Sequence, residues 1–120
     1  MSDLVEYIGP WADASTVRDY LHIDDAVLGR RLENREILGC RFRDNRVYFP
    51  IRQFQSGQVI EDLKYVLDVL ATGIDSPRTW ATWLAGIPGD DMITNWEHLR
   101  AGRLDLVLTE ARRDAERWNH

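Results

Sequence analysis

Arginines are concentrated in one short part of this sequence. Positions 30 to 52 hold seven arginines against three acidic residues, a local net charge of +4, although the whole chain of 120 residues carries −5. A guanidinium group donates several hydrogen bonds in a fixed fork, which suits phosphate oxygens and the edge of guanine. From position 53 to the end the balance reverses to −4, with eleven acidic and seven basic residues. One end of the protein could therefore meet nucleic acid while the other meets a protein.

Other side chains that commonly perform chemistry are sparse. The sequence has no G-x-x-x-x-G-K-[ST] phosphate loop, no H-E-x-x-H and no G-x-S-x-G motif. The three histidines are far apart, and the pairs Asp24-Asp25 and Asp90-Asp91 are more typical of helix caps and solvated loops than of a cation site. The lone Cys40 can form neither an intramolecular disulfide nor a cysteine-pair zinc site. We therefore expect a protein that is not an enzyme and that binds no cofactor and no metal ion.

The composition indicates a small globular protein. Hydrophobic residues make up 44% of the chain and charged residues 29%, and no run of eighteen apolar residues occurs. Near the N-terminus, Asp3 and Glu6 stand where a signal peptide would need basic residues followed by an apolar stretch. We expect a cytoplasmic protein without membrane association, in which Cys40 is a buried small hydrophobe.

The arginine-rich region begins with a pattern typical of a helix-turn-helix. Ser15 is a good N-cap, and apolar residues at helical spacing predict a short helix over residues 14–22. Asp24 and Asp25 then supply a second N-cap, and the next helix is expected to run to about Arg35. Two short helices with a tight connection form a helix-turn-helix.

A change to strand periodicity follows this pair of helices. Residues 37–42 and 46–49 are separated by Arg43-Asp44-Asn45, which predicts a β-hairpin, and Pro50 should end its second strand. A helix that enters the major groove and a hairpin wing beside it would together form a DNA-binding surface. Its candidate contacts are Arg30, Arg31, Asn34, Arg35, Arg41, Arg43, Asn45 and Arg46.

Apolar stripes in the second half predict further helices. One is expected over residues 59–73, one from the Asp75-Ser76-Pro77 start to Gly86, a short one opened by the capping box at residues 94–97, and a last one over residues 104–118. Trp118 lies so close to the end of the chain that it is a candidate anchor for a partner protein, with intramolecular packing as the alternative.

These elements predict a fold that is mainly α with one β-hairpin. A winged helix-turn-helix DNA-binding head at residues 1–55 should be followed by a small helical bundle at residues 59–120, which would provide dimerisation and partner binding.

Several motifs resemble known families. Residues 17–54 resemble winged helix-turn-helix proteins of the excisionase and MerR type, in the run V-x-x-Y-L-H-I-D-D-A-V-L-G-R-R-L followed by I-L-G-C-R-F and the wing. Y-F-P-I-R-Q-F at 48–54, S-P-R-T-W-A-T-W-L at 76–84 and N-W-E-H-L-R-A-G at 95–102 are similar to the MbcA/ParS/Xre antitoxin group. Antitoxins of that group usually carry a five-helix Xre-like N-terminal part, so the winged head departs from their pattern.

The resemblance implies a dimeric antitoxin of a type II toxin-antitoxin pair. Such a protein would bind and neutralise a cognate toxin, commonly an NAD-consuming RES-domain enzyme, and would repress the promoter of both genes by binding operator DNA. It further implies that Arg113, Arg117, Trp118 and His120 lie near the toxin. One alternative is a phage or plasmid excisionase or repressor without a toxin partner, and another is a winged-helix protein-interaction module without a role on nucleic acid. A toxin gene in the adjacent reading frame would favour the first hypothesis.

Overall fold

A three-stranded antiparallel sheet forms one side of the head. The computed structural model describes residues 8–119, so Asp3 and Glu6 lie outside it. β3 (Val47–Pro50) is the central strand, with β1 (Trp11–Asp13) on one edge and β2 (Cys40–Arg41) on the other. The β2–β3 hairpin confirms the predicted wing. β1 was not predicted, because its pairing of Ala12 with Phe49 joins segments far apart in the sequence.

The helix-turn-helix consists of α2 (Ala14–Leu21) and α3 (Asp25–Glu33). Asp24 caps α3 as predicted, because its carboxylate accepts a 2.9 Å hydrogen bond from the Val27 amide. The N-cap of α2 is Asp13 and not Ser15, since the Asp13 carboxylate accepts from the Thr16 amide at 2.8 Å. This backbone hydrogen bond is the main reason why the pKa of Asp13 is lowered. The prediction of Ser15 as the cap was therefore wrong by two residues.

The tip of the wing has the tight turn that its sequence predicts. The Phe42 amide donates to the Arg46 carbonyl at 2.9 Å, and the Asn45 amide donates to the Phe42 carbonyl at 3.0 Å. Asn45 has a φ of 67°, a left-handed conformation that asparagine tolerates better than most residues. Asp44 accepts a 2.6 Å hydrogen bond from the Tyr48 hydroxyl, which lowers the pKa of this carboxyl.

A second, smaller hairpin connects the head to the helices. After a 3₁₀ turn, η1 (Ile51–Gln53), the strands β4 (Phe54–Gln55) and β5 (Gln58–Val59) pair around a Ser56-Gly57 turn in which both residues have positive φ. The sequence placed Val59 and Ile60 at the start of the next helix. That helix begins only at Leu63, because Val59 belongs to β5.

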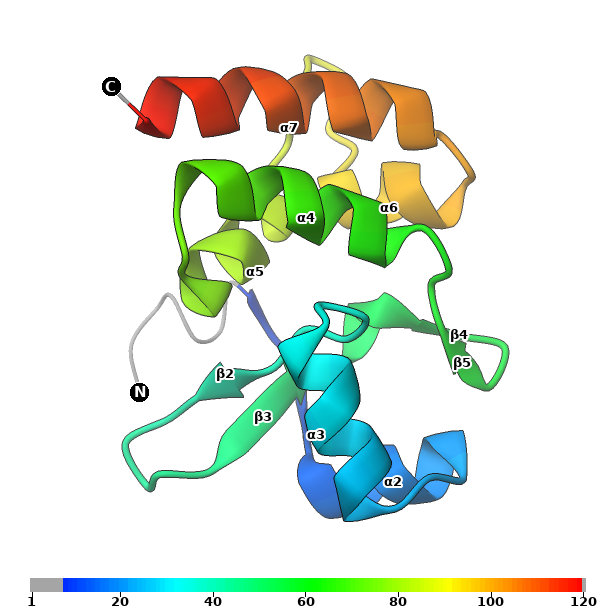
Figure 1. Ribbon diagram of the computed structural model, residues 1–120. Coiled ribbons are helices and arrows are strands. Elements are labelled where there is room, and N and C mark those ends of the chain that lie inside the picture. The colour runs from blue at the N-terminus through cyan, green and yellow to red at the C-terminus, as the bar shows by residue number, and fades with distance from the viewer. Residues whose placement is uncertain (1–7, 120) are drawn as a thin grey trace.

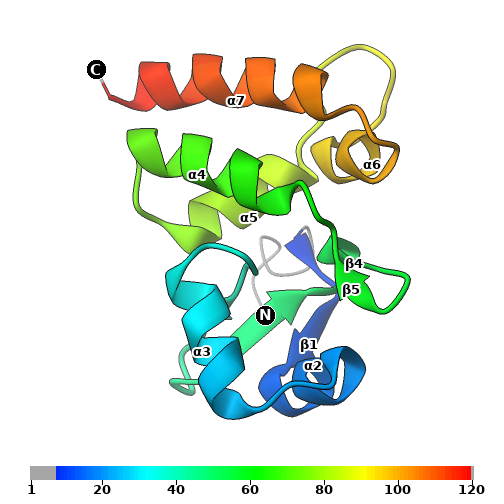
Figure 2. The ribbon, with the colours of Figure 1, turned by 45° about the vertical axis from the view of Figure 1, so that its right-hand side comes forward.

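Four helices form the second half of the molecule. They are α4 (Leu63–Gly73), α5 (Pro77–Ala85), α6 (Asn95–Arg100) and α7 (Leu104–Trp118). The predicted capping box opens α6, and Ser76 with Pro77 opens α5 as predicted. α7 lies along α4 and farther from the head than α4 does (Figures 1 and 2). No helix within residues 8–119 is long and apolar enough to cross a membrane.

The buried apolar residues form two clusters, and the larger one joins the two halves. A small cluster around Val17, Leu28, Ile37 and Phe49 lies within the head. The larger cluster combines Ile8, Leu38 and Cys40 of the head with the buried faces of α4, α5, α6 and α7. The chain therefore has a winged helix-turn-helix followed by a small helical bundle, as predicted, and the two parts are joined through buried apolar contacts.

Candidate nucleic-acid interface

A groove separates α3 from the wing. It is lined by Leu28, Gly29 and Leu32 of α3, by Arg46, Val47 and Phe49 at β3, and by Asp13, Ala14, Ser15 and Asp25 at the helix starts. The groove has a volume of about 410 Å³. α3 and the hairpin, which were predicted to share one surface, therefore lie on two sides of this groove.

The outer face of α3 carries small side chains beside an arginine. Ala26, Gly29, Arg30 and Glu33 are exposed and recur at helical spacing. A Cβ added at Gly29 would meet no atom within 4 Å, so the helix backbone is open to close approach here. A helix with such a face can approach DNA closely when it enters the major groove, and the longer side chain of Arg30 can then extend toward the bases.

Three of the predicted arginines have exposed, available guanidinium groups. Arg30 on α3, and Arg43 and Arg46 on the wing, are exposed and form no ion pair with any residue in the described range 8–119. In Figure 1 the tip of the wing projects to the left of the head, away from α3. The structure thus leaves fewer exposed arginines without an ion pair than the sequence predicted, within residues 8–119.

Arg35 has a different role from the one expected. It lies beyond the end of α3 with a φ of 58°, and its Nε donates to the Asp68 carboxylate of α4 at 2.8 Å. Lys64 Nζ lies 3.2 Å from the same carboxylate and donates to the Asn34 carbonyl at 2.8 Å. Partial burial opposes ionisation of Asp68, but the hydrogen bonds from Arg35 and Lys64 outweigh it, and the pKa of Asp68 is lowered. Arg35 therefore joins the head to α4 and is removed from the candidate DNA surface.

Other predicted contacts are turned away or engaged within the head. Arg31 is half-buried and lines a separate depression with Glu36 and Lys64, on the side of the second hairpin. Asn34 donates from its side chain to Glu36 at 3.4 Å. Arg41 Nη1 donates to the Asn45 carbonyl at 2.8 Å and lies 3.2 Å from the Asn45 side-chain oxygen. Arg41 and Asn45 thus hold the wing turn in shape.

The predicted partner-binding residues on α7 fall into two groups. The side chains of Arg113 and Arg117 are 67% and 70% exposed, and each forms an ion pair one helical turn back, with Glu110 and Asp114 respectively. Trp118 is half-buried and packs against the large core, which favours its alternative role in intramolecular packing. His120 lies outside the described residues.

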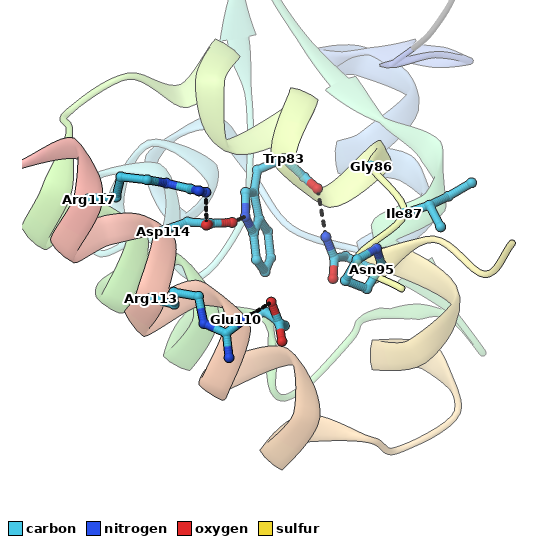
Figure 3. A pocket seen from close by; sticks show the side chains of 9 residues that line it. Trp83, Gly86, Ile87, Asn95, Glu110, Arg113, Asp114 and Arg117 are labelled. Carbon is cyan, nitrogen blue, oxygen red and sulfur yellow. Dashed lines mark hydrogen bonds and ion pairs between the residues drawn. The ribbon is translucent and has the colours of Figure 1, made fainter. Parts of the chain in front are cut away.

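A pocket next to these arginines was not predicted. It has a volume of about 340 Å³ and lies between the end of α5, the start of α6 and α7 (Figure 3). Trp83 Nε1 donates to the Asp114 carboxylate at 2.7 Å, and the Asn95 side chain donates to the Trp83 carbonyl at 2.8 Å. From the sequence, Trp83 was assigned to a buried face and Asn95 to a helix start. No local pattern indicates that the two meet beside α7.

Within residues 8–119, no arrangement of side chains is suited to metal binding or to thiol chemistry. No group of three or more histidine, cysteine, aspartate or glutamate side chains in residues 8–119 could hold a metal ion. Cys40 is buried, and this burial raises the pKa of its thiol to about 11, so little thiolate forms near neutral pH.

No protein-family model and no curated protein matches this chain. Among solved structures, the chain is similar to the NMR structure of Rv2175c, with a TM-score of 0.72. The similarity covers 88% of this chain and 81% of that chain, at 22% sequence identity. At this identity the likeness concerns the fold alone, and the arrangement of head and helices is therefore one that a solved protein shares.

Proposed function

We propose that this protein is a DNA-binding regulator whose head contacts duplex DNA through α3 and the wing. The observation that supports this most directly is that Arg30, Arg43 and Arg46 are exposed and form no ion pair within residues 8–119, with Arg46 also lining the groove between α3 and β3. Arginines that are free of internal ion pairs can bind phosphates without first breaking a bond to a carboxylate. The attraction has to be local to these arginines, because residues 1–55 together carry nine acidic and eight basic residues.

We infer different tasks for the two parts of the head. The exposed face of α3, with Ala26, Gly29 and Arg30, is suited to the major groove, where Arg30 can read a guanine edge. Arg43 and Arg46 at the wing tip are suited to backbone phosphates or to the adjacent minor groove. Binding should therefore have a large sequence-independent component and a smaller sequence-specific one.

We further propose that the helical half binds a partner protein, as expected for an antitoxin that represses its own promoter. Arg113 and Arg117 are exposed on α7, which lies on the far side of α4 from the head (Figure 1). A toxin, such as a RES-type enzyme, bound at α7 would leave α3 and the wing accessible. An excisionase-like protein would share the DNA-binding head and lack this partner.

The DNA-binding proposal can be tested with fluorescence anisotropy on a labelled duplex from upstream of the gene, compared with a scrambled duplex. Replacing Arg30, Arg43 and Arg46 together with glutamine should weaken binding to both duplexes. The matched control is a triple variant of Arg100, Arg103 and Arg112 on the helical half, which removes the same charge. Equal weakening by the two triple variants would contradict the proposed surface.

The partner-binding proposal can be tested by co-expression with each adjacent gene. A stable complex that forms with the intact chain, and rescue of growth from the adjacent gene product, are the expected results. DNA binding in the absence of any neutralised gene product would instead favour the excisionase-like alternative.

A further inference from the structure

The interior of the pocket between α5, α6 and α7 is lined by oxygen acceptors. The Glu110 and Asp114 carboxylates are contributed by α7, with side chains only 26% and 19% exposed, and the Asn95 amide lies opposite them on α6. The donors among these polar groups are already engaged, since Trp83 Nε1 binds Asp114 and Asn95 Nδ2 binds the Trp83 carbonyl. Among the described residues that line the pocket, the cationic groups are those of Arg113 and Arg117, which form ion pairs with Glu110 and Asp114.

One of these acceptors has no partner. Asn95 is 3% exposed, and its Oδ1 is buried without a hydrogen bond from any described residue. The orientation of the amide is fixed, because exchanging its oxygen and nitrogen would place two oxygens against each other at the Trp83 carbonyl. In Figure 3 the free oxygen points away from Trp83 O, toward the space beside Glu110. A buried acceptor is unfavourable without a donor, so an incoming N–H group would satisfy it.

An aromatic wall stands beside the acceptors. The indole of Trp83 lines the pocket, and its only N–H group is used by Asp114, so its ring can act only as an apolar π surface. Tryptophan is the aromatic residue that attracts a cation most strongly. Ile87 and Pro88 add apolar surface at the edge, which suits the aliphatic part of a long basic side chain.

Arg113 and Arg117 of α7 also line the pocket, and their side chains are largely exposed. Arg113 approaches Glu110 only to 3.4 Å, and Arg117 is 70% exposed although it contacts Asp114. Ion pairs between residues one helical turn apart contribute little to stability when the cation is largely exposed, so an incoming cation can displace either guanidinium group at a small cost. A second cation could then occupy the inner position.

We propose that this pocket receives an arginine side chain of a partner protein. The guanidinium group would donate to Glu110, Asp114 and Asn95 Oδ1 while stacking on Trp83. The inference deepens the partner-binding half of the proposed function and rests on it, but it is independent of DNA binding.

The test follows the indole N–H resonance of Trp83 in the full-length protein during titration with N-acetyl-arginine amide. A saturable shift is expected, and N-acetyl-citrulline amide, which has the same shape without the charge, should bind at least about tenfold more weakly. Glu110→Gln should weaken binding of the arginine amide by a similar factor. The matched control Glu116→Gln, which removes an exposed carboxylate of α7 outside the pocket, should leave binding unchanged.

The proposal would be overturned by citrulline binding as tightly as arginine, by a preference for N-acetyl-aspartate or inorganic phosphate, or by equal effects of the two glutamine variants. Tighter binding of the free amino acid arginine than of its blocked form would also overturn it, because the source would then be a metabolite. If Glu110→Gln still forms the complex with the adjacent gene product, the pocket assignment fails while the proposed function stands. If the arginine amide binds but no complex forms, the pocket stands and the antitoxin function fails.

Discussion

The side chain of Gln53 forms the hydrogen bonds to the Leu38 backbone that a neighbouring strand would otherwise form. Its side-chain oxygen accepts from the Leu38 amide at 2.8 Å, and its side-chain nitrogen donates to the Leu38 carbonyl at 2.8 Å and to the Pro50 carbonyl at 3.1 Å. Gln53 is fully buried, as is Leu38, so these backbone groups have no water to bind instead. One side chain therefore closes the junction at which the wing, the second hairpin and the helices meet.

Replacing Gln53 with leucine should destabilise the fold strongly. Leucine has a similar volume but leaves the Leu38 amide and carbonyl unpaired in the core, at about 1–3 kcal/mol for each unsatisfied group. Urea denaturation followed by circular dichroism gives the free energy of unfolding. Gln55→Leu, at an exposed position two residues away, is the control and should change stability little. Similar losses in both variants would contradict the role of Gln53.

Two helical glycines should respond to alanine in opposite directions. At Gly73, the end of α4, an added Cβ would lie 2.5 Å from the Ala115 carbonyl oxygen and 2.7 Å from its Cα. Both atoms belong to the backbone of α7, so Gly73→Ala must push the helices apart, at about 1–3 kcal/mol. Gly29→Ala meets only open space in α3 and should stabilise by about 0.5–1 kcal/mol. Thermal melting of both variants measures the sign, and stabilisation by Gly73→Ala would refute the close contact.

The link between Arg35 and Asp68 should make stability depend on pH. The pKa of Asp68 is lower in the folded protein than its ordinary value, so the link contributes fully above that ordinary value and is lost as pH falls through the folded pKa. The difference in unfolding free energy between wild type and Asp68→Asn should therefore be present at about pH 6 and vanish near about pH 2–3. Asp19→Asn removes an exposed carboxylate of α2 and serves as the control. A difference that grows as pH falls would have the wrong sign.

Salt should reveal which arginines contact phosphate. The logarithm of the binding constant falls with the logarithm of the salt concentration, by about 0.9 for each phosphate neutralised on duplex DNA. Single substitutions Arg43→Gln and Arg46→Gln should each reduce this slope by about that amount and weaken all sequences alike. Arg30→Gln should additionally reduce discrimination between operator and scrambled duplex. Unchanged slopes for both wing variants would remove the wing from the interface.

Local signals in the sequence predicted most helices and the wing. Asp24 and Thr94 cap helices through their immediate neighbours, and Asn45 adopts a turn conformation that depends on its own backbone. Features that need distant partners were missed. β1 exists because Ala12 meets Phe49, and no apolar alternation marks so short a strand.

The candidate site shows the same division. Exposure of Arg30, Arg43 and Arg46 follows from helix and hairpin periodicity, which the sequence carries. Arg35 and Asp68 are 33 positions apart in the sequence. The sequence does not indicate which of the many arginines will bind such a distant carboxylate. The pocket at Asn95 could not be predicted from the sequence either. The capping box accounts for the residues around Asn95, whereas the unpartnered Asn95 Oδ1 results from the contact between the amide and Trp83.

One apolar cluster combines Ile8, Leu38 and Cys40 with α4–α7. The two halves therefore cannot be separated without exposing buried apolar surface. Recombination near residues 55–59 would expose the inner surfaces of both products, so relatives should gain or lose the two halves together. Fusion tags belong at the chain ends, and the proposed DNA-binding and partner-binding activities have to be separated by surface substitutions in the intact chain.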